Sequence, residues 1–250
     1  MHKFFANSLF IGKKLEILPH CHSTNNVALE MLNQAPQPEG TVVITENQTS
    51  GKGQRGNHWE SEPYKNLTFS IILNPNFLAP ADQFYLNMVA SLGVSDALKS
   101  ELTGVSIKWP NDIYARNKKI SGILIENSLK GGVIENAVIG IGINVNQTDY
   151  REAKATSMAE ITLQSYDLND IFNRVIKSIE KYYLLMRQGS FARIREAYLS
   201  NLYWLNEVHL FQADTVFSGE IVDVDERGRL VIQSNAYRTA YDIKEIVFLE

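Results

Sequence analysis

The sequence predicts an α+β fold, in which a mixed β-sheet with packed helices is followed by a small β-barrel. Short runs rich in β-branched residues alternate with helical patterns through the first four-fifths of the chain, whereas Val208–Leu249 shows short strands only. With 250 residues, of which 44% are hydrophobic, the chain suffices for a sizeable core and a small appended domain. We therefore expect domains at 1–205 and 206–250.

Five strands are predicted in the first domain. Each is a short run rich in β-branched residues between turn formers, a composition that suits a pleated, partly buried surface. The predicted strands are Thr41–Glu46, Leu67–Leu73, Val105–Trp109, Ile120–Glu126 and Ala137–Val145. Because Pro110 cannot continue a central ladder, the third strand should end in a turn at Asn111 and Asp112.

Apolar residues at helical spacing predict four helices. One contains Val27–Leu32, and the preceding Ser23–Asn26 can be an N-cap, a pocket for a small polar head group, or both. A second should run from its cap Asp82 to Glu101. The clearest signal, about Asn169 to Arg187, predicts a core helix, and a further helix follows over Phe191–Leu202.

The C-terminal segment predicts strands alone. Turn-forming clusters separate Val208–Phe211, Val216–Phe217, Gly219–Val224, Leu230–Gln233 and Ile246–Leu249. Strands at this spacing predict a small β-barrel of about forty residues.

Composition excludes several classes of protein. A net charge of −4 without a long basic run argues against a nucleic-acid partner. The absence of both a secretory signal and an apolar run long enough to span a bilayer argues against a membrane protein. A single cysteine, Cys21, excludes an internal disulfide and favours the cytoplasm, and no Cys and His cluster has zinc-ligand spacing. We do not expect Cys21 and His22 to form a catalytic pair.

A glycine-rich loop between Gln48 and Trp59 predicts an anion site. Its glycines, at 51, 53 and 56, interleave with Lys52, Gln54 and Arg55. Neither the dinucleotide fingerprint nor the Walker pattern fits this loop. Closely approachable backbone N–H groups beside long cationic side chains suit a phosphate or a carboxylate, although a plain flexible loop remains an alternative.

Two further segments carry polar residues beside apolar strands. In Lys108–Asp112 the last two residues can form a plain turn, or Asp112 can bind magnesium or orient a ribose. Lys119 abuts an apolar strand and can direct its ammonium group to an anion held by the loop, whereas Lys118 should be a solvated turn charge.

The strand Gly140–Asn144 contains two glycines. They weaken a strand unless a group such as a planar base approaches its backbone closely. Asn144 suits the edge of an adenine, or is an ordinary residue at a strand end.

Taken in order, five segments resemble the biotin–protein ligases, also called biotin–[acetyl-CoA-carboxylase] ligases or holocarboxylase synthetases. The segments are Ser23–Asn25, Gly51–Trp59, Lys108–Asp112, Lys119–Gly122 and Gly140–Asn144. The resemblance covers essentially the whole chain and implies a class II synthetase-like catalytic domain followed by an SH3-like domain. Members that also repress transcription carry an N-terminal winged helix-turn-helix. Because the motifs begin here by Ser23, we expect the monofunctional type.

The resemblance implies a two-step reaction. With Mg²⁺, the biotin carboxylate attacks the α-phosphate of ATP to give biotinyl-5′-AMP and pyrophosphate, and the acyl group then passes to a lysine of a biotin carboxyl carrier domain. A homodimer is possible, as in other family members. A lipoate–protein ligase of the same fold and a non-catalytic vitamin-binding protein are the alternatives.

The resemblance also assigns roles to residues. The implied biotin-binding residues are Ser23, Thr24, Asn25, Gln48, Lys52, Gly53, Gln54, Lys119 and Gly122. The implied adenylate-binding residues are Arg55, Trp59, Asn111, Asp112, Lys119 and Asn144. Lys119 and Arg55 would be catalytic, and Asp112 would bind Mg²⁺.

The loop departs from the family's usual Gly-Arg-Gly-Arg-x-Gly. Lys52 and Gln54 replace its two arginines. Because lysine lacks the bidentate fork of arginine, we expect weaker retention of the intermediate. We also expect the loop from Gly51 to Asn57 to be unordered without ligand, because of its glycine content.

Overall fold

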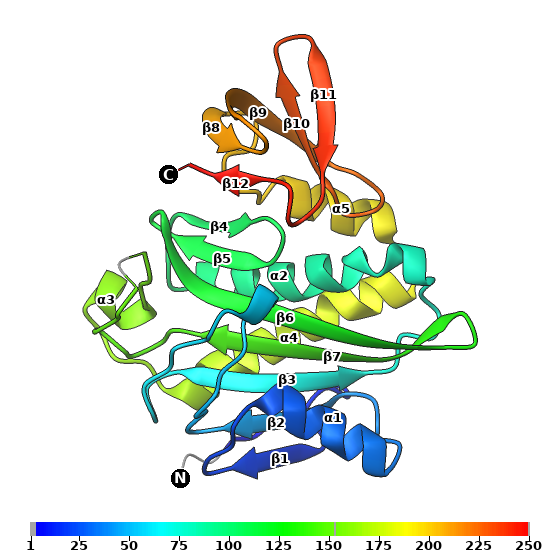
Figure 1. The fold of residues 1–250 in the computed structure, drawn as a ribbon. Helices are drawn as coiled ribbons and strands as arrows, with labels where there is room; N and C mark the ends of the chain where they lie inside the picture. The colour runs from blue at the N-terminus through cyan, green and yellow to red at the C-terminus, as the bar shows by residue number, and fades with distance from the viewer. Residues whose placement is uncertain (1–3, 153, 250) are drawn as a thin grey trace.

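A computed structural model describes residues 4–152 and 154–249, with the side chain of Arg55 outside the description. A seven-stranded sheet forms the centre of the larger part (Figure 1). Its strands are β1 (Leu15–Leu18), β2 (Thr41–Thr45), β3 (Leu67–Leu73), β4 (Val105–Lys108), β5 (Asp112–Ala115), β6 (Lys118–Lys130) and β7 (Val133–Ile143). The order is β1-β2-β3-β7-β6-β5-β4, and β1 runs parallel to β2 whereas the other neighbours are antiparallel. The predicted mixed sheet is confirmed.

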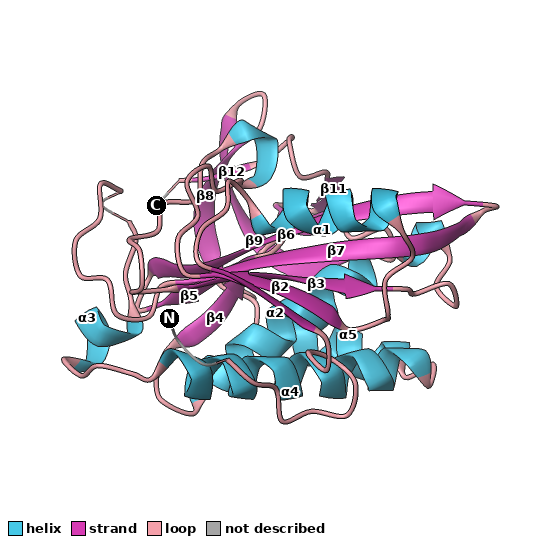
Figure 2. Cartoon of the chain, turned by 90° about the horizontal axis from the view of Figure 1, so that it is seen from below, coloured by secondary structure: helices cyan, strands magenta, loops and turns pink. Residues whose placement is uncertain are grey.

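Helices cover both faces of this sheet. They are α1 (Thr24–Gln34), α2 (Phe84–Lys99), α3 (Met158–Thr162), α4 (Leu168–Arg187) and α5 (Phe191–Leu199). Figure 2 shows α2 and α4 on one face and α1 on the other. Alternate strand residues follow this division, since Val42 and Ile44 join the main core, whereas Val43 packs with Ala28 of α1.

The strongest periodic signal in the sequence is confirmed as α4. It begins after Asp167, whose side chain accepts a hydrogen bond of 3.0 Å from the Asp170 N–H. Its apolar stripe is buried, from Phe172 to Met186. This face packs on α2, where a Cβ on Gly93 would lie 2.4 Å from Ile179 Cγ1. Gly93 therefore lets the two helices approach closely.

The predicted helix starts need two corrections. Asp82 does not cap α2, because it ends a 3₁₀ turn, Pro80–Asp82, that leads directly into the helix at Phe84. Ser23 does occupy the N-cap position of α1, but its side chain makes no capping hydrogen bond. The N-cap interpretation of Ser23 is therefore wrong for its side chain, which lines a cavity instead.

The C-terminal residues form a second, antiparallel sheet. Its strands are β8 (Val208–Gln212), β9 (Val216–Val224), β10 (Leu230–Ser234), β11 (Tyr237–Tyr241) and β12 (Val247–Phe248), in the order β11-β10-β9-β8-β12. This arrangement agrees with the expected small SH3-like domain. The domain boundary after residue 205 stays a prediction. Within the described ranges, no helix has the length and hydropathy needed to cross a membrane.

A buried hydrogen bond and a partly exposed ion pair connect the C-terminal sheet to the larger part. The Trp109 indole N–H donates a 2.9 Å hydrogen bond to the Gly228 carbonyl oxygen in the β9–β10 turn. Arg195 of α5 forms an ion pair with Asp223 of β9. The C-terminal sheet thus holds the segment that links β4 to β5 in place.

Candidate active site

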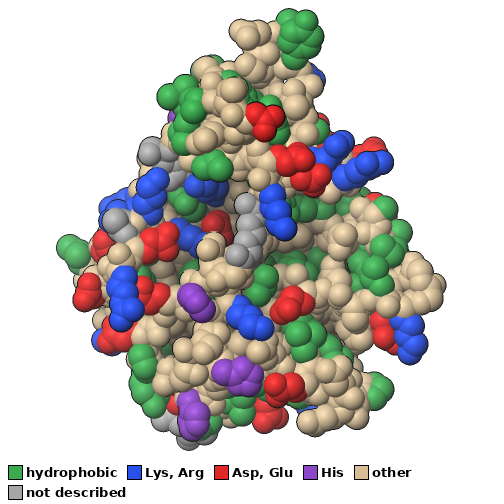
Figure 3. Space-filling view, viewed as in Figure 1, with side chains coloured by type: hydrophobic (Ala, Val, Ile, Leu, Met, Phe, Trp, Pro, Cys, Tyr) green, Lys and Arg blue, Asp and Glu red, His purple; other side chains and the backbone are tan. Residues whose placement is uncertain are grey.

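A cavity of about 530 Å³ lies on the face of the large sheet that carries α1. Most of the predicted site residues line it. They are Ser23, Thr24, Asn25, Gln48, Lys52, Gly53, Gln54, Trp59, Asn111, Asp112, Lys119 and Gly122. Figure 3 shows basic and acidic side chains mixed on the face in view, without a single basic patch. Residues far apart in the sequence therefore meet in one cavity.

One end of the cavity is polar and uncharged. The Ser70 hydroxyl lies 2.7 Å from the Thr24 hydroxyl and 2.6 Å from Asn25 Oδ1. The Asn25 amide donates a 2.7 Å hydrogen bond to the Glu126 carboxylate. Thr24, Asn25 and Ser70 are at most 4% exposed. These hydrogen bonds fix the side chains at the start of α1 against β3 and β6.

The other end of the cavity is charged. Lys119 Nζ lies 2.8 Å from Asp112 Oδ1, and both side chains are about a quarter exposed, at 26% and 29%. Asp112 begins β5, so the turn that precedes it ends at Asn111. The hairpin from β5 to β6 thus holds a cation and an anion together at the cavity wall.

Lys118 differs from the prediction. It begins β6 instead of lying in the turn, but its side chain is solvated as expected, 45% exposed, with Nζ 3.4 Å from Glu160 Oε1. The turn instead comprises Arg116 and Asn117, which both have positive φ, a hairpin geometry that leaves Lys118 in the strand.

The glycines of β7 do permit close approach, but the approaching groups belong to the protein. A Cβ on Gly140 would lie 2.2 Å from Asn25 Oδ1, and one on Gly142 would lie 2.3 Å from Trp59 Cε2. The Trp59 indole N–H is buried without a hydrogen-bond partner among the described residues. Asn25 and Trp59, rather than a planar base, therefore lie over these glycines in this structure.

One predicted residue, Asn144, stands apart from this cavity. Asn144 lines a neighbouring cavity of about 840 Å³, whose wall shares Trp59 and Lys119 with the first. Its Nδ2 donates to the Thr156 carbonyl oxygen at 2.9 Å, whereas Oδ1 is buried without a partner in the part of the chain described. Arg55 cannot be placed, because its side chain lies outside the described residues. The Asn111 amide also donates within the protein, to the Ile123 carbonyl oxygen.

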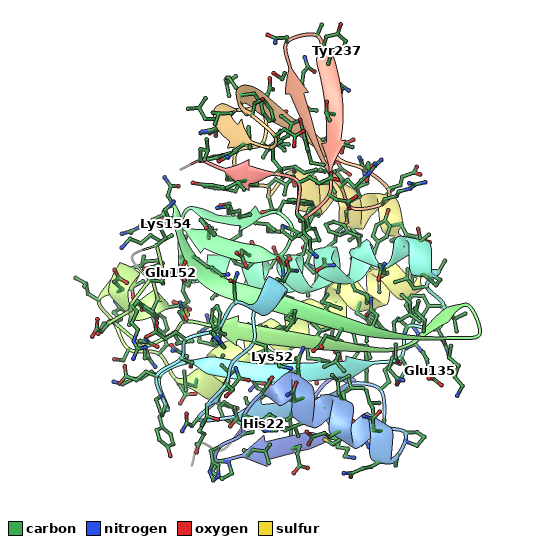
Figure 4. The ribbon with its side chains drawn as sticks, in the orientation of Figure 1. His22, Lys52, Glu135, Glu152, Lys154 and Tyr237 are labelled. Atoms are coloured by element: carbon green, nitrogen blue, oxygen red, sulfur yellow. The ribbon has the colours of Figure 1, made fainter. Side chains whose placement is uncertain are left out.

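The glycine-rich loop forms a narrow hairpin beside the cavity. Gly53 N–H donates to the Asn57 carbonyl oxygen at 2.7 Å, and Trp59 N–H donates to that of Gly51 at 3.0 Å. Lys52 extends toward α1, where its ammonium donates a 2.7 Å hydrogen bond to Asn26 Oδ1 (Figure 4). The expectation that this loop is unordered without ligand stays a prediction.

Sequence reasoning missed several contributors to the site. Ser70 and Glu126 hold Asn25 from outside the cavity lining, and a serine inside a mostly apolar strand was the available signal for Ser70. Ile243, Ile246 and Phe248 bring the C-terminal segment to the cavity wall, for which the sequence carried no signal.

Cys21 and His22 show no sign of a catalytic pair. Burial raises the pKa of the Cys21 thiol above its ordinary value, which keeps the thiol protonated at neutral pH. His22 lies 3.6 Å from Glu30 on the outer surface of α1. Within the described residues, no group of three or more His, Cys, Asp or Glu side chains is arranged to hold a metal.

Comparisons with known proteins agree with this geometry. A model of the Biotin/lipoate A/B protein ligase family matches residues 18–144. The bifunctional ligase/repressor BirA of Bacillus subtilis is 31% identical over 244 residues, which cover 93% of this chain and 73% of that protein. The biotin–[acetyl-CoA-carboxylase] ligase of Paracoccus denitrificans is 28% identical over 245 residues, which cover 93% of this chain and 99% of that protein.

A solved structure extends the likeness to the fold. The biotin protein ligase from Aquifex aeolicus, in complex with biotin and ATP, has 30% sequence identity and a TM-score of 0.78, and the match covers 94% of this chain and 98% of that one. A family match over half of the chain, relatives aligned over nearly all of it and the same fold agree with one another. The chain therefore belongs to the biotin/lipoate A/B protein ligase family.

Proposed function

We propose that this protein is a biotin–protein ligase that activates biotin with ATP and transfers it to a lysine of a biotin carboxyl carrier domain. The observation that carries the proposal is one cavity with uncharged polar side chains at Thr24 and Asn25 and, at its charged end, the Lys119 ammonium group beside Asp112. Biotin has the same two ends, a neutral ureido ring and a carboxylate. The cavity volume of about 530 Å³ lies in the range of small-molecule sites.

In the first step, a biotin carboxylate oxygen bonds to the α-phosphorus of ATP and pyrophosphate leaves. Two anionic groups must come together, so a fixed cation is needed where their charges crowd in the transition state. Lys119 supplies it, and Asp112 holds the ammonium group in place before the substrates arrive. Arg55, from the loop, is assigned the role of a second catalytic cation.

In the second step, the amine of the acceptor lysine attacks the acyl carbon of biotinyl-5′-AMP. The bond to the phosphate oxygen breaks, AMP leaves and the amine loses a proton. Because the adenylate is already activated, no enzyme nucleophile is required. This agrees with the protonated, buried Cys21 thiol.

The nucleotide is assigned to the side of the site near Trp59. Trp59 and Lys119 line both cavities, and Asn144 Oδ1, in the wall of the second, is an acceptor with no partner among the residues that the structure describes. An acceptor suits the amino group of adenine, so Asn144 is assigned to the base, together with Asn111.

The charged end suits Mg²⁺ only when substrate phosphate oxygens supply further ligands. Mg²⁺ is commonly held by one or two carboxylates plus phosphate oxygens and water, and Asp112 supplies one carboxylate. Bound there, the ion would neutralise phosphate charge.

Biotin is favoured over lipoate by the polar end. The dithiolane of lipoate has no N–H group or carbonyl oxygen in its ring, so it would leave Thr24 and Asn25 without ligand partners. A buried polar site discriminates strongly against a ligand that lacks the matching groups. A non-catalytic vitamin-binding protein is disfavoured, because the cation needed for adenylation is in place.

The remaining assignments concern the surroundings of the enzyme. The acceptor is a biotin carboxyl carrier domain of a biotin-dependent carboxylase. The single cysteine favours a reducing compartment, so the cytoplasm is assigned. A homodimer, formed with or without the adenylate, is retained as part of the proposal.

The test is mass spectrometry of a carrier domain incubated with the protein, ATP, Mg²⁺ and either biotin or lipoate. One added biotinyl group that requires ATP is the expected result. Addition of lipoyl instead would transfer the assignment to lipoate ligation. An unmodified carrier domain in both reactions would refute ligase activity.

A further inference from the structure

Asn25 at the polar end of the cavity is held by three neighbours. Its Nδ2 donates to Glu126 Oε2 at 2.7 Å and to the Leu124 carbonyl oxygen at 3.4 Å, both on β6. Its Oδ1 lies 2.6 Å from the Ser70 hydroxyl on β3. Gly140, on the strand between β3 and β6, leaves the space that Asn25 occupies. The amide thus bridges two strands and has one orientation.

The carboxylate of Glu126 determines that orientation. An ionised carboxylate only accepts hydrogen bonds, so the amide must turn its N–H₂ group toward Glu126 and its oxygen away. The Ser70 hydroxyl does not enforce it, because a hydroxyl can donate or accept. The Leu124 carbonyl oxygen only accepts and favours the same orientation, but at 3.4 Å it holds the amide less strongly than Glu126 at 2.7 Å. A hydrogen bond to a charged acceptor is also stronger than one between neutral groups.

The orientation carries through to Thr24. Because Oδ1 of Asn25 only accepts, the Ser70 hydroxyl proton points to Asn25. Ser70 Oγ then accepts the Thr24 hydroxyl proton across 2.7 Å, a shorter contact than the 3.4 Å from Thr24 Oγ1 to Gln48 Oε1. Thr24 Oγ1 and Asn25 Oδ1 are left as acceptors toward the cavity, so this end selects a ligand that donates through N–H groups.

We infer that Glu126, a residue of β6 outside the cavity lining, is a positioning and specificity-determining residue for the ligand head group. It acts by fixing Asn25, and through Ser70 also Thr24, as hydrogen-bond acceptors. The inference rests on the proposed function, since the ureido ring of biotin carries two N–H donors. The inference adds Glu126, which does not itself line the cavity, to the residues required for binding the head group.

The test compares two variants of similar side-chain size. Glu126→Gln keeps an oxygen that can accept from Asn25, whereas Glu126→Met keeps the bulk and loses the acceptor. Biotin binding is measured by calorimetry without ATP, and KM for biotin and ATP by pyrophosphate exchange. We expect E126M to raise Kd and KM for biotin by about tenfold or more, with KM for ATP within about twofold of wild type. E126Q should restore most of the affinity.

A double variant keeps the inference testable if E126M is poorly folded. Asn25→Asp places two carboxylates against each other and should abolish biotin binding. Adding Glu126→Gln exchanges the positions of amide and carboxylate, so an acceptor oxygen again faces Ser70 and the cavity. N25D/E126Q should therefore bind biotin at least about tenfold more tightly than N25D.

The outcomes separate the inference from the proposed function. Wild-type protein that binds no biotin would remove both. Wild-type binding with E126M equal to wild type, or N25D/E126Q no better than N25D, would overturn the inference and leave the proposed function intact. Equal losses for biotin and ATP would assign Glu126 a general structural role, against the inference.

Discussion

Replacing Lys119 with alanine should separate catalysis from stability. Lys119 Nζ lies 2.8 Å from Asp112 at the cavity wall, with the lysine side chain 26% exposed. The variant removes a positive charge from the place where, in the proposed reaction, two substrate anions meet. It also leaves Asp112 unpaired, so the cavity gains net negative charge.

The magnitude follows from the electrostatics of a partly exposed site. Two unit charges about 4 Å apart interact by about 4 kcal/mol at an effective dielectric constant of about 20. If most of that interaction develops in the transition state, the adenylation rate falls by about a thousandfold. The ion pair with Asp112 is partly solvated, so its loss should lower the free energy of unfolding by less than about 1 kcal/mol.

The assay is ATP–pyrophosphate exchange with biotin, beside urea unfolding of the same samples. Lys118→Ala is the matched control, because it removes the neighbouring charge, which lies near Glu160 instead. We expect K118A to stay within about threefold of wild type. Exchange by K119A within about tenfold of wild type would refute the assignment of the catalytic charge, and an equal fall in K118A would indicate a non-specific charge effect.

Three other substitutions test the architecture of the site. Gly142→Ala would place a Cβ 2.3 Å from the Trp59 ring, so the indole must move, and we expect a higher KM for ATP with biotin binding retained. Trp109→Phe removes the hydrogen bond to the Gly228 carbonyl and should cost about 1–3 kcal/mol in urea unfolding. Glu180→Ala leaves three backbone N–H groups of the N-terminal segment unpaired, and amide exchange there should accelerate.

Each of these expectations has a contradicting result. Unchanged tryptophan fluorescence and ATP kinetics in G142A would show that the indole is not confined by that glycine. Unfolding of W109F at the wild-type urea midpoint would show that the bond between the two sheets contributes nothing to stability. Exchange at residues 9–11 that stays slow in E180A would remove Glu180 as the anchor of that segment.

The sequence predicted the parts of the fold whose pattern is local. The helix α4 has a continuous apolar stripe, and β3 has a run of apolar residues, so both were recognisable. The strands β1, β5 and β11 were missed. Each has only four or five residues, and β11 reads Tyr-Arg-Thr-Ala-Tyr, which becomes a strand through pairing with β10 rather than through its own composition.

The site residues also divide into those with a local signal in the sequence and those that only the fold brings together. Its glycines and lysines were visible because each is unusual where it stands in the sequence. The neighbours of Asn25 were not, because Ser70 is 45 positions away and Glu126 is 101 positions away, and only the register of the sheet brings them together. Glycines in β7 indicated a close approach, but a missing side chain cannot identify the approaching group.

The structure also gives a physical meaning to the unusual lysine of the loop. Lys52 uses its ammonium group on Asn26, where it connects the loop to the first turn of α1. The ammonium group is a compact charge. Because it is hydrogen-bonded to Asn26, it stabilises an anion near Asp112 less than a forked guanidinium would. Lys119 is the other lysine among the described residues that line the cavity. Much of the positive charge at the reacting centre therefore depends on Lys119, which is why a single substitution there should affect adenylation so strongly.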